Sequence, residues 1–387
     1  MSTIPPKPID TALQFPELAG RVWLNTAHQA PLPDCARAAA EAAVGAKVRP
    51  WELSTERFGD VPRRVRSALA RLIGVPADEP ILGNSASYGL HLIAENFPWA
   101  DGDEVLTMKG DFPSDILPWI AQAQRGVRVR QLQPRGRVLQ PDEVAAAIGP
   151  RTRLLCLTWV HSLSGWAIDL EAIGRLCRDA GVVFVLNASQ ALGARPLDVR
   201  RAPVDAVIAA GWKWLLGPYA TGFCWLSPAL LARLRCTRSY WLAVLTSDDL
   251  GRTEIDLTPR DDAGAAKWDL FATANFFNFE PWAASLELLL GYGIEAVRAH
   301  DEALVQRLVD GLDRDRWRLT SPETGPARST LVFVEPRDGS AQDLVRTLAA
   351  AGVHVAHRSG ALRLSPHVCN TAEDVDRALE ALHRVAA

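Results

Sequence analysis

The sequence predicts an α/β fold with a mostly parallel sheet sandwiched by helices, followed by a smaller α+β domain. From about residue 35, short apolar segments alternate with longer segments in which apolar residues recur with helical spacing. This alternation is typical of parallel strands joined by crossover helices. Some apolar runs, such as VVFVL at 182–186, show no polar alternation. Such runs are typical of strands that are buried on both faces.

The elements follow in order along the chain. Residues 1–20 are polar and proline-rich and are predicted as an N-terminal arm, before a large domain at 21–265. In the large domain, helical spacing is found at 35–49, 60–73, 113–125 and 169–180, and strand signals at 80–82, 104–108, 127–131, 154–157, 182–186 and 207–209. The stretch 237–265 is polar and turn-rich. Beyond it we expect a small domain at 266–387, with helices at 281–292, 295–312, 341–351 and from 371, and strands at 331–334, 353–355 and 361–364.

Composition limits the function classes. The 387 residues carry a formal net charge of −3, so no basic footprint for nucleic acid is present. No secretory leader and no run of 18 apolar residues occurs, which favours a cytoplasmic protein without a membrane span. The six cysteines form no C-x-x-C pair, and no metal site is expected. GNSASYG is not a G-x-G-x-x-G motif, and a P-loop is absent. Only five of the 42 basic residues are lysines, which leaves few candidates for lysine chemistry.

Two polar segments follow neighbouring predicted strands. NASQ occupies 187–190, and GWKW occupies 211–214. The carboxyl ends of parallel strands are where ligands bind in open α/β sheets. Lys213, set between two tryptophans, is expected to be partly desolvated, which lowers the pKa of its ammonium and frees a nucleophilic amine. A surface lysine lying over two aromatic rings is the alternative that these residues leave open.

Seven segments in a fixed order resemble the pyridoxal 5′-phosphate (PLP) enzymes of fold type I, in the aminotransferase class V or cysteine-desulfurase-like superfamily. They are VWLNTAHQAPLP, GNSASYGL, GDFPSDILPW, VHSLSGWAIDL, NASQALG, GWKWLLGP and ALRLSPHVCNT, and together they extend over nearly the whole chain. Within this superfamily the chain is most similar to the isopenicillin-N-epimerase-like branch. The resemblance implies PLP as the cofactor and the PLP-dependent transferase fold.

The resemblance also implies roles for residues around the cofactor. Lys213 would form the Schiff base and move the Cα proton. Ser85, Ala86 and Ser87 match the helix start that binds the phosphate, and Phe112 matches the ring that stacks on the cofactor. Asn187 matches the partner of the pyridine nitrogen, and Gln190 matches the partner of the ring oxygen. Trp212 matches the neighbour of the lysine, and Thr273 matches a threonine that comes from a second subunit. A simple helix cap is the alternative for the serines. Pro113 takes the place of Phe112 if the match shifts by one residue. The threonine match implies a homodimer.

On the substrate side, the resemblance implies that Arg363 binds the carboxylate of an amino acid. A guanidinium suits this role because it is planar and stays charged when enclosed. The opening loop contributes Asn25 and His28, and the VHSLSGW segment contributes His161 and Ser162. For His161, a structural hydrogen bond is the alternative to acid–base chemistry.

Three departures from the family pattern narrow the chemistry. Asn187 stands where the family usually has an aspartate, so we expect a weaker electron sink. An asparagine can donate to an unprotonated ring nitrogen or accept from a protonated one. No cysteine occurs between Cys236 and Cys369, which disfavours a persulfide-forming cysteine desulfurase. Trp212 precedes the lysine where many relatives have histidine or tyrosine.

These observations predict an enzyme that acts on an amino acid or an S-cysteine conjugate in specialised metabolism, such as antibiotic biosynthesis. The expected reaction is carbon–sulfur lysis by β-elimination, or a decarboxylation. An amino-acid epimerase and a class V aminotransferase remain as alternatives, because the first step at Cα is the same. A binding protein with a structural lysine is the alternative from another class.

Overall fold

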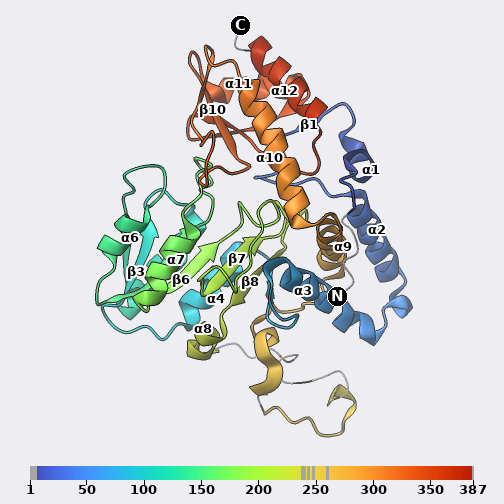
Figure 1. The fold of residues 1–387 in the computed structure, drawn as a ribbon. Helices are drawn as coiled ribbons and strands as arrows, with labels where there is room; N and C mark the ends of the chain where they lie inside the picture. The colour runs from blue at the N-terminus through green and yellow to red at the C-terminus, as the bar shows by residue number, and fades with distance from the viewer. Residues whose placement is uncertain (1–6, 237–240, 242–244, 246–248, 259–260, 386–387) are drawn as a thin grey trace.

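The computed structural model describes residues 7–236, 241, 245, 249–258 and 261–385. Part of the turn-rich stretch 237–265 therefore lies outside the described residues. A large part built on a central sheet lies below a smaller part that contains the C-terminal helices (Figure 1). Within the described ranges, no helix has the length and apolar character needed to cross a membrane.

The large sheet has seven strands in the order β2-β8-β7-β6-β5-β3-β4. Their bounds are β2 (Ile81–Gly83), β3 (Glu104–Met108), β4 (Arg128–Leu132), β5 (Thr152–Thr158), β6 (Val183–Asn187), β7 (Ala206–Ala210) and β8 (Gly222–Leu226). Strand β8 runs antiparallel to both of its neighbours, and the other strand pairs in the sheet are parallel. The mostly parallel sheet is confirmed, whereas the sequence analysis did not identify β8.

Both faces of the sheet are buried. Along β5, Leu155 and Leu157 belong to one apolar cluster, while Leu154 and Cys156 belong to a second cluster. Successive side chains of a strand point to opposite faces, so a strand covered on both sides has apolar residues at every position. This explains the continuous apolar runs in the sequence.

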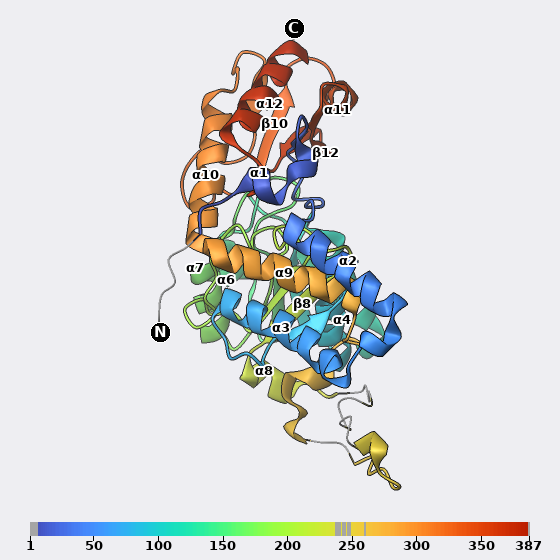
Figure 2. The same ribbon diagram turned by 90° about the vertical axis from the view of Figure 1, so that its right-hand side faces the viewer.

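Helices cover the two faces. The helices up to residue 292 are α1 (Thr11–Gln14), which lies beside α2, and α2 (Asp34–Val48), α3 (Thr55–Ile73), α4 (Ala86–Asn96), α5 (Leu117–Ile120), α6 (Pro141–Ala147), α7 (Leu170–Asp179), α8 (Pro228–Arg233) and α9 (Phe276–Tyr292). Short 3₁₀ segments are found at Pro16–Leu18, Pro50–Glu52, Pro113–Asp115, Ala121–Arg125, Asp249–Gly251 and Asp261–Trp268. Figure 2 shows α2, α9 and α3 side by side in front of the sheet, and α9 packs against both of the others.

The expected continuous helix at 113–125 is wrong. The segment is broken into a 3₁₀ turn at Pro113–Asp115, the four-residue α5, and a second 3₁₀ turn at Ala121–Arg125. Both Pro113 and Pro118 lie in the first turn of their element, where a missing N–H has no cost. Between them, Ile116 has φ −121° and ψ −48°, which interrupts the helix. Asp115, in the first 3₁₀ turn, is fully buried and contacts Asn187 at the end of β6.

The smaller part has a four-stranded antiparallel sheet in the order β12-β13-β10-β9. Its elements are α10 (Ile294–Asp310), β9 (Trp317–Leu319), β10 (Val332–Pro336), α11 (Ala341–Ala350), β12 (Ala356–Arg358), β13 (Ala361–Leu364) and α12 (Ala372–Val385). Strands β12 and β13 are joined through Ser359 and Gly360, both at positive φ, as a tight hairpin turn requires.

The N-terminal segment crosses to the smaller part. Strand β1 (Val22–Trp23) pairs in parallel with β11 (Val353–His354), and Leu24 packs in the core of the C-terminal sheet. Conversely, α9 packs on the large part although it follows residue 265. The domain boundaries at residues 20 and 265 stay predictions.

Candidate active site

A cavity of about 350 Å³ lies at the carboxyl ends of the parallel strands. This is the edge at which the sequence analysis expected ligand binding. The cavity brings together most of the predicted site residues, namely His28, Ser85, Ala86, Ser87, Phe112, Ser162, Asn187, Gln190, Trp212, Lys213 and Arg363. It is also lined by residues that the analysis did not single out, including Ser114, Thr158, Ser189, Tyr219 and Arg358.

Lys213 follows β7 and reaches into this cavity. Burial, together with the nearby positive charge of Arg363, lowers the pKa of its ammonium to about 8. The Nζ atom lies 5.8 Å from the centre of the Phe112 ring. An amine with a depressed pKa is deprotonated in a useful fraction near neutral pH and can attack a carbonyl carbon.

The two tryptophans beside Lys213 in the sequence have surroundings that differ from each other. Trp214 is fully buried, and its indole Nε1 donates to Oε1 of Gln190 at 3.1 Å. Trp212 instead packs against Tyr219, with ring centres 4.8 Å apart, at the cavity wall. The aromatic ring that faces the lysine amine is therefore Phe112, which lines the cavity as the sequence match required, whereas Pro113 does not.

The start of α4 faces the cavity through Ser85, Ala86 and Ser87. The Ser85 hydroxyl accepts from the N–H of Tyr88 at 3.2 Å, so its side chain forms the helix cap that was the stated alternative. The helix terminus still directs N–H groups and a partial positive charge toward the cavity, which suits an anion such as phosphate. Gly222 of β8 permits this arrangement, since a Cβ there would lie 2.7 Å from the backbone of Ser85.

Asn187 ends β6 and lines the cavity. Its Nδ2 donates to Oδ1 of Asp115 at 2.7 Å, and its Oδ1 accepts from the N–H of Ser189 at 3.0 Å. Asp115 is fully buried, and its second oxygen, Oδ2, has no hydrogen-bond partner in the described part of the chain. Burial and the neighbouring Asp111 raise the pKa of the Asp115 carboxyl well above its usual value. Asp115 belongs to the quoted segment GDFPSDILPW, yet nothing in the sequence alone linked it to Asn187.

Gln190 and His28 line the same cavity. The Nε2 of Gln190 donates to the carbonyl of Ala27 at 3.1 Å, so both ends of its amide have partners in the protein. The pKa of His28 is lowered by burial and by the positive charges of Arg358, Arg363 and Lys213. A neutral imidazole is therefore the favoured form at this position.

Three predicted residues do not line the cavity. His161 is held by Ser164 Oγ at 2.8 Å and by the Gly110 carbonyl at 3.0 Å, so both ring nitrogens are used in structural contacts. Asn25 lines an adjoining, more open hollow, which shares His28 and Arg358 with the cavity. Thr273 is buried in the segment before α9. Its predicted contact with a second subunit stays a prediction.

Two arginines of the hairpin formed by β12 and β13 face the cavity. Arg363 is only 3% exposed, its Nη1 donates to the Ser162 carbonyl at 3.4 Å, and its Nε has no partner among the described residues. Burial and the nearby Arg358 lower the pKa of Arg363 to about 9. An enclosed guanidinium without a carboxylate partner is suited to an anionic ligand. Arg358 could have been found from the hairpin register, because Arg363 pairs with Ala356 and Arg358 lies two residues beyond Ala356, on the same face of the sheet.

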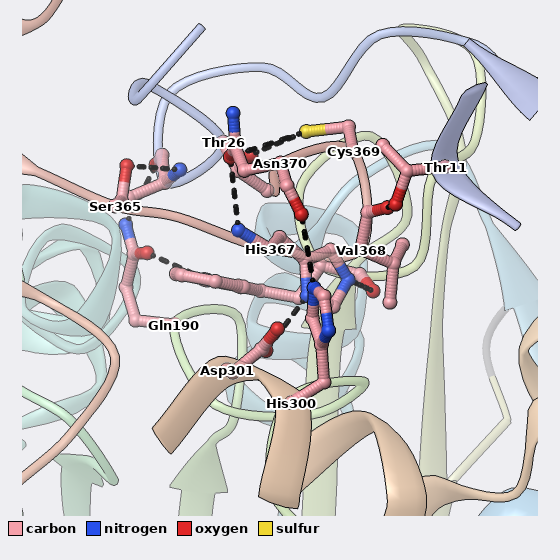
Figure 3. A network of polar contacts seen from close by, with 12 residues as sticks. Thr11, Thr26, Gln190, His300, Asp301, Ser365, His367, Val368, Cys369 and Asn370 are labelled. Atoms are coloured by element: carbon pink, nitrogen blue, oxygen red, sulfur yellow. Dashed lines mark hydrogen bonds and ion pairs between the residues drawn. The ribbon is translucent and has the colours of Figure 1, made fainter. Parts of the chain in front are cut away.

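A hydrogen-bond network joins the segment that follows Arg363 to Asp301 and to Thr26 (Figure 3). His367 Nε2 contacts the Trp214 carbonyl at 3.2 Å, and its Nδ1 contacts Oδ2 of Asp301 on α10 at 2.8 Å. Ser365 Oγ accepts from the N–H of Ala27 at 3.1 Å. These contacts tie elements of both parts of the molecule to the position of Lys213.

A family model described as aminotransferase class-V matches residues 44–378. The chain belongs to this family. Isopenicillin N epimerase of Streptomyces clavuligerus is 27% identical over 93% of this chain and 94% of its own length. A probable cysteine desulfurase of Methanothermobacter thermautotrophicus is 25% identical over 84% and 83%, respectively. The resemblance inferred from the seven segments is confirmed.

Solved structures support the same fold. The cystine C–S lyase C-DES in complex with its reaction product cysteine persulfide has a TM-score of 0.86 at 21% identity, covering 96% of this chain and 99% of that structure. A mutant of C-DES with glycine covalently linked to the PLP cofactor has a TM-score of 0.87, also at 21% identity, over 97% and 98%. The PLP-dependent transferase fold expected from the sequence is confirmed.

As a member of this family, the chain is a PLP-dependent enzyme. The described residues fit the cofactor: the α4 terminus suits its phosphate, Phe112 offers a ring face, Asn187 offers an amide, and the amine of Lys213 can bond its aldehyde carbon. The Nε of Arg363, which is buried without a partner in the described chain, suits an anionic group in the same cavity.

Proposed function

We propose that this enzyme cleaves the carbon–sulfur bond of an S-cysteine conjugate or a related amino acid by β-elimination. The observation that carries the proposal is that Lys213, with a pKa of about 8, and Arg363, with an Nε that has no partner among the described residues, face one cavity. A base and a carboxylate-binding group at one site are what removal of a Cα proton requires.

The roles divide among the residues of this cavity. Arg363 binds the α-carboxylate, which orients the Cα–H bond toward the Lys213 amine. The amine then takes the Cα proton, and bound PLP supplies the electron withdrawal that makes this proton acidic. Overall, the Cα–H and Cβ–S bonds break, the proton taken by Lys213 goes to the departing sulfur so that a thiol leaves, and the released enamine takes up water to give pyruvate and ammonia. Decarboxylation is the variant in which the carboxylate leaves instead of the proton.

The second arginine supports a substrate with a second anionic group. Arg358 lines both the cavity and the adjoining hollow, so it lies where the distal part of an S-conjugate would extend. The likeness of the fold to a cystine C–S lyase agrees with this choice of reaction. The relative named isopenicillin N epimerase keeps epimerisation as the second candidate, since that reaction needs the same proton removal. Aminotransfer ranks third.

A persulfide-forming desulfurase of the type with a catalytic thiol is not favoured, although several relatives carry that name. No cysteine is among the described residues that line the cavity. Cys369 is buried next to Thr26, with Sγ 3.8 Å from Oγ1, and burial raises the pKa of its thiol. A thiol with a raised pKa is a poor nucleophile.

The experiment is incubation of the holoenzyme with a panel of cysteine S-conjugates, cystine and simple amino acids in deuterated water. Mass spectrometry then detects pyruvate, ammonia, carbon dioxide and deuterium at Cα. Pyruvate and a released thiol support lysis. Deuterium exchange with recovery of both enantiomers supports epimerisation, and would overturn the lyase assignment. Lys213→Ala is the control, since it lacks the amine.

The oligomeric state and location belong to the same proposal. We expect a homodimer in which Thr273 of one subunit approaches the phosphate of the other, and a cytoplasmic location. Exposed aromatic side chains near this segment, Phe271 and Phe277 at 54% and 48% exposure, support a contact surface there. Light scattering of the purified enzyme tests the dimer, and a monomeric mass would contradict it.

A further inference from the structure

The side chain of Asn187 is held in one orientation from two sides. A backbone N–H, that of Ser189, points at the amide oxygen from 3.0 Å. A peptide N–H can only donate, so the oxygen of the Asn187 amide must face it. If the amide were reversed, its NH₂ group would oppose the Ser189 N–H, and two donors would meet without an acceptor.

The nitrogen of this amide consequently faces Asp115. The distance from Nδ2 to Asp115 Oδ1 is 2.7 Å. A carboxylate accepts this hydrogen bond, and so does the carbonyl oxygen of a protonated carboxyl. The amide orientation is therefore the same in either protonation state of Asp115. The charged groups that act on Asp115 are Asp111 and Lys213.

One N–H of Asn187 remains after these two contacts. The NH₂ group has two hydrogens, and only the one toward Asp115 has an acceptor in the described part of the chain. Asn187 lines the cavity beside Ser189 and Lys213. The remaining donor is thus available to a group bound in the cavity, while the amide oxygen is already used by Ser189.

We propose that Asp115 is a positioning residue that fixes Asn187 as a hydrogen-bond donor to the ring nitrogen of the cofactor, so that this nitrogen stays unprotonated. The inference rests on the proposed function, since it assumes PLP chemistry at this site. The sequence left open whether Asn187 donates to an unprotonated ring nitrogen or accepts from a protonated one, and the inference selects the donor. An unprotonated ring withdraws electrons weakly, so negative charge at Cα is stored only briefly. That favours a reaction in which the β-sulfur leaves at once, over one that needs a long-lived carbanion.

The test is the ¹⁵N resonance of ring-labelled PLP in the reconstituted enzyme, followed across pH. The wild type is expected to show the resonance of a free-base pyridine nitrogen throughout the stable pH range. Asn187→Asp, which places a carboxylate at this position, is expected to show the protonated resonance. A protonated nitrogen in the wild type overturns the inference, and this measurement needs no Asp115 variant to fold.

Two variants of Asp115 separate positioning from packing. Asp115→Asn keeps an acceptor oxygen for Asn187, and is expected to retain the wild-type resonance and a cofactor dissociation constant within about twofold. Asp115→Leu has a similar shape but no acceptor, and is expected to bind the cofactor about tenfold more weakly, the factor that corresponds to one hydrogen bond of about 1.4 kcal/mol. If Asp115 serves packing alone, the leucine variant keeps wild-type affinity and resonance, which contradicts the inference.

The outcomes distinguish this inference from the proposed function. A wild-type protein that takes up PLP through Lys213 but carries a protonated ring nitrogen contradicts only the role of Asp115. A wild type with an unprotonated ring nitrogen that epimerises its substrates contradicts only the lyase assignment.

Discussion

His367 and Asp301 form a hydrogen-bonded pair in which both side chains are fully buried, with Nδ1 2.8 Å from Oδ2. The second ring nitrogen of His367 reaches the carbonyl of Trp214, the residue after Lys213. A carbonyl only accepts, so Nε2 must carry a hydrogen. The pair thus connects α10 of the smaller part to the lysine loop of the larger part through one imidazole.

Removal of one partner of this pair should strongly destabilise the enzyme. We expect His367→Leu to lower the free energy of unfolding by about 3–5 kcal/mol, because it leaves the Asp301 carboxyl buried without its partner. The double variant, with Asp301→Leu added, should recover much of this loss, since two apolar side chains can replace a buried pair. Urea denaturation monitored by tryptophan fluorescence measures both.

A matched control lies on the same two elements. Arg307 on α10 pairs with Asp376 on α12, and their side chains are 50% and 44% exposed. Arg307→Ala should cost only about 0–1 kcal/mol, because exposed pairs gain little. If His367→Leu and Arg307→Ala lowered the free energy of unfolding equally, burial would not explain the strength of the His367–Asp301 contact.

The depressed pKa of Lys213 should be visible in the pH dependence of cofactor uptake. Only the neutral amine can bond an aldehyde, so the rate at which the apoenzyme captures PLP should rise with pH and level off above about 8. A lysine with its ordinary pKa of 10.5 would instead give a rise that continues toward that pH. Stopped-flow absorbance in the visible range measures the rate.

The contribution of Arg363 to the lowered pKa of Lys213 can be tested separately. Burial is the largest cause of this shift, and charge repulsion from Arg363 is the second. Arg363→Met should therefore move the midpoint of the uptake profile to higher pH, since a cation that opposes protonation is removed. A midpoint that stays unchanged in this variant would show that burial alone sets the pKa.

Gly222 should be needed for the start of α4, which we propose as the phosphate site. A methyl group at residue 222 would lie 2.7 Å from the backbone of Ser85, so Gly222→Ala must displace the helix start. We expect a stability loss of about 1–3 kcal/mol, typical of overpacking, and faster loss of PLP on dialysis. Gly59→Ala, in α3 with no atom near the added methyl, should instead stabilise by about 0.5–1 kcal/mol. Retention of PLP by Gly222→Ala would contradict the steric argument.

The sequence predicted the architecture where local pattern and burial agree. The runs that became β5, β6 and β7 are apolar because both faces of the sheet are covered, and that pattern needs no knowledge of tertiary contacts. It did not indicate β8, whose antiparallel position between β2 and β7 depends on distant partners. It also assigned one helix to 113–125, although the non-helical backbone of Ile116 interrupts that segment.

The same division holds at the site. Lys213, Phe112 and Arg363 could be placed at one cavity from the sequence because each lies in a segment with a recognisable family pattern, while their roles stay predictions. Asp115 could not, because its importance comes from a contact with Asn187, 72 residues away. The partners of His161, Ser164 and the Gly110 carbonyl, are likewise apparent only in the folded chain, and they agree with the structural hydrogen bond given as the alternative for this residue.

Arg363 should contribute to function while opposing stability. Its guanidinium is 3% exposed and has no carboxylate partner in the described chain, so burial of its charge is costly until substrate binds. We expect Arg363→Met to leave the apoenzyme equally or more stable to urea. The same change should lower kcat/KM by about 100- to 1000-fold, or about 3–4 kcal/mol, mainly through KM, because a carboxylate contact is present before and during the reaction. Arg363→Lys should recover only part of this loss, since an ammonium cannot bind bidentately. Arg175→Met, at an exposed position on α7, is the control and should change neither quantity. A large stability loss in Arg363→Met would show instead that this arginine holds the fold together.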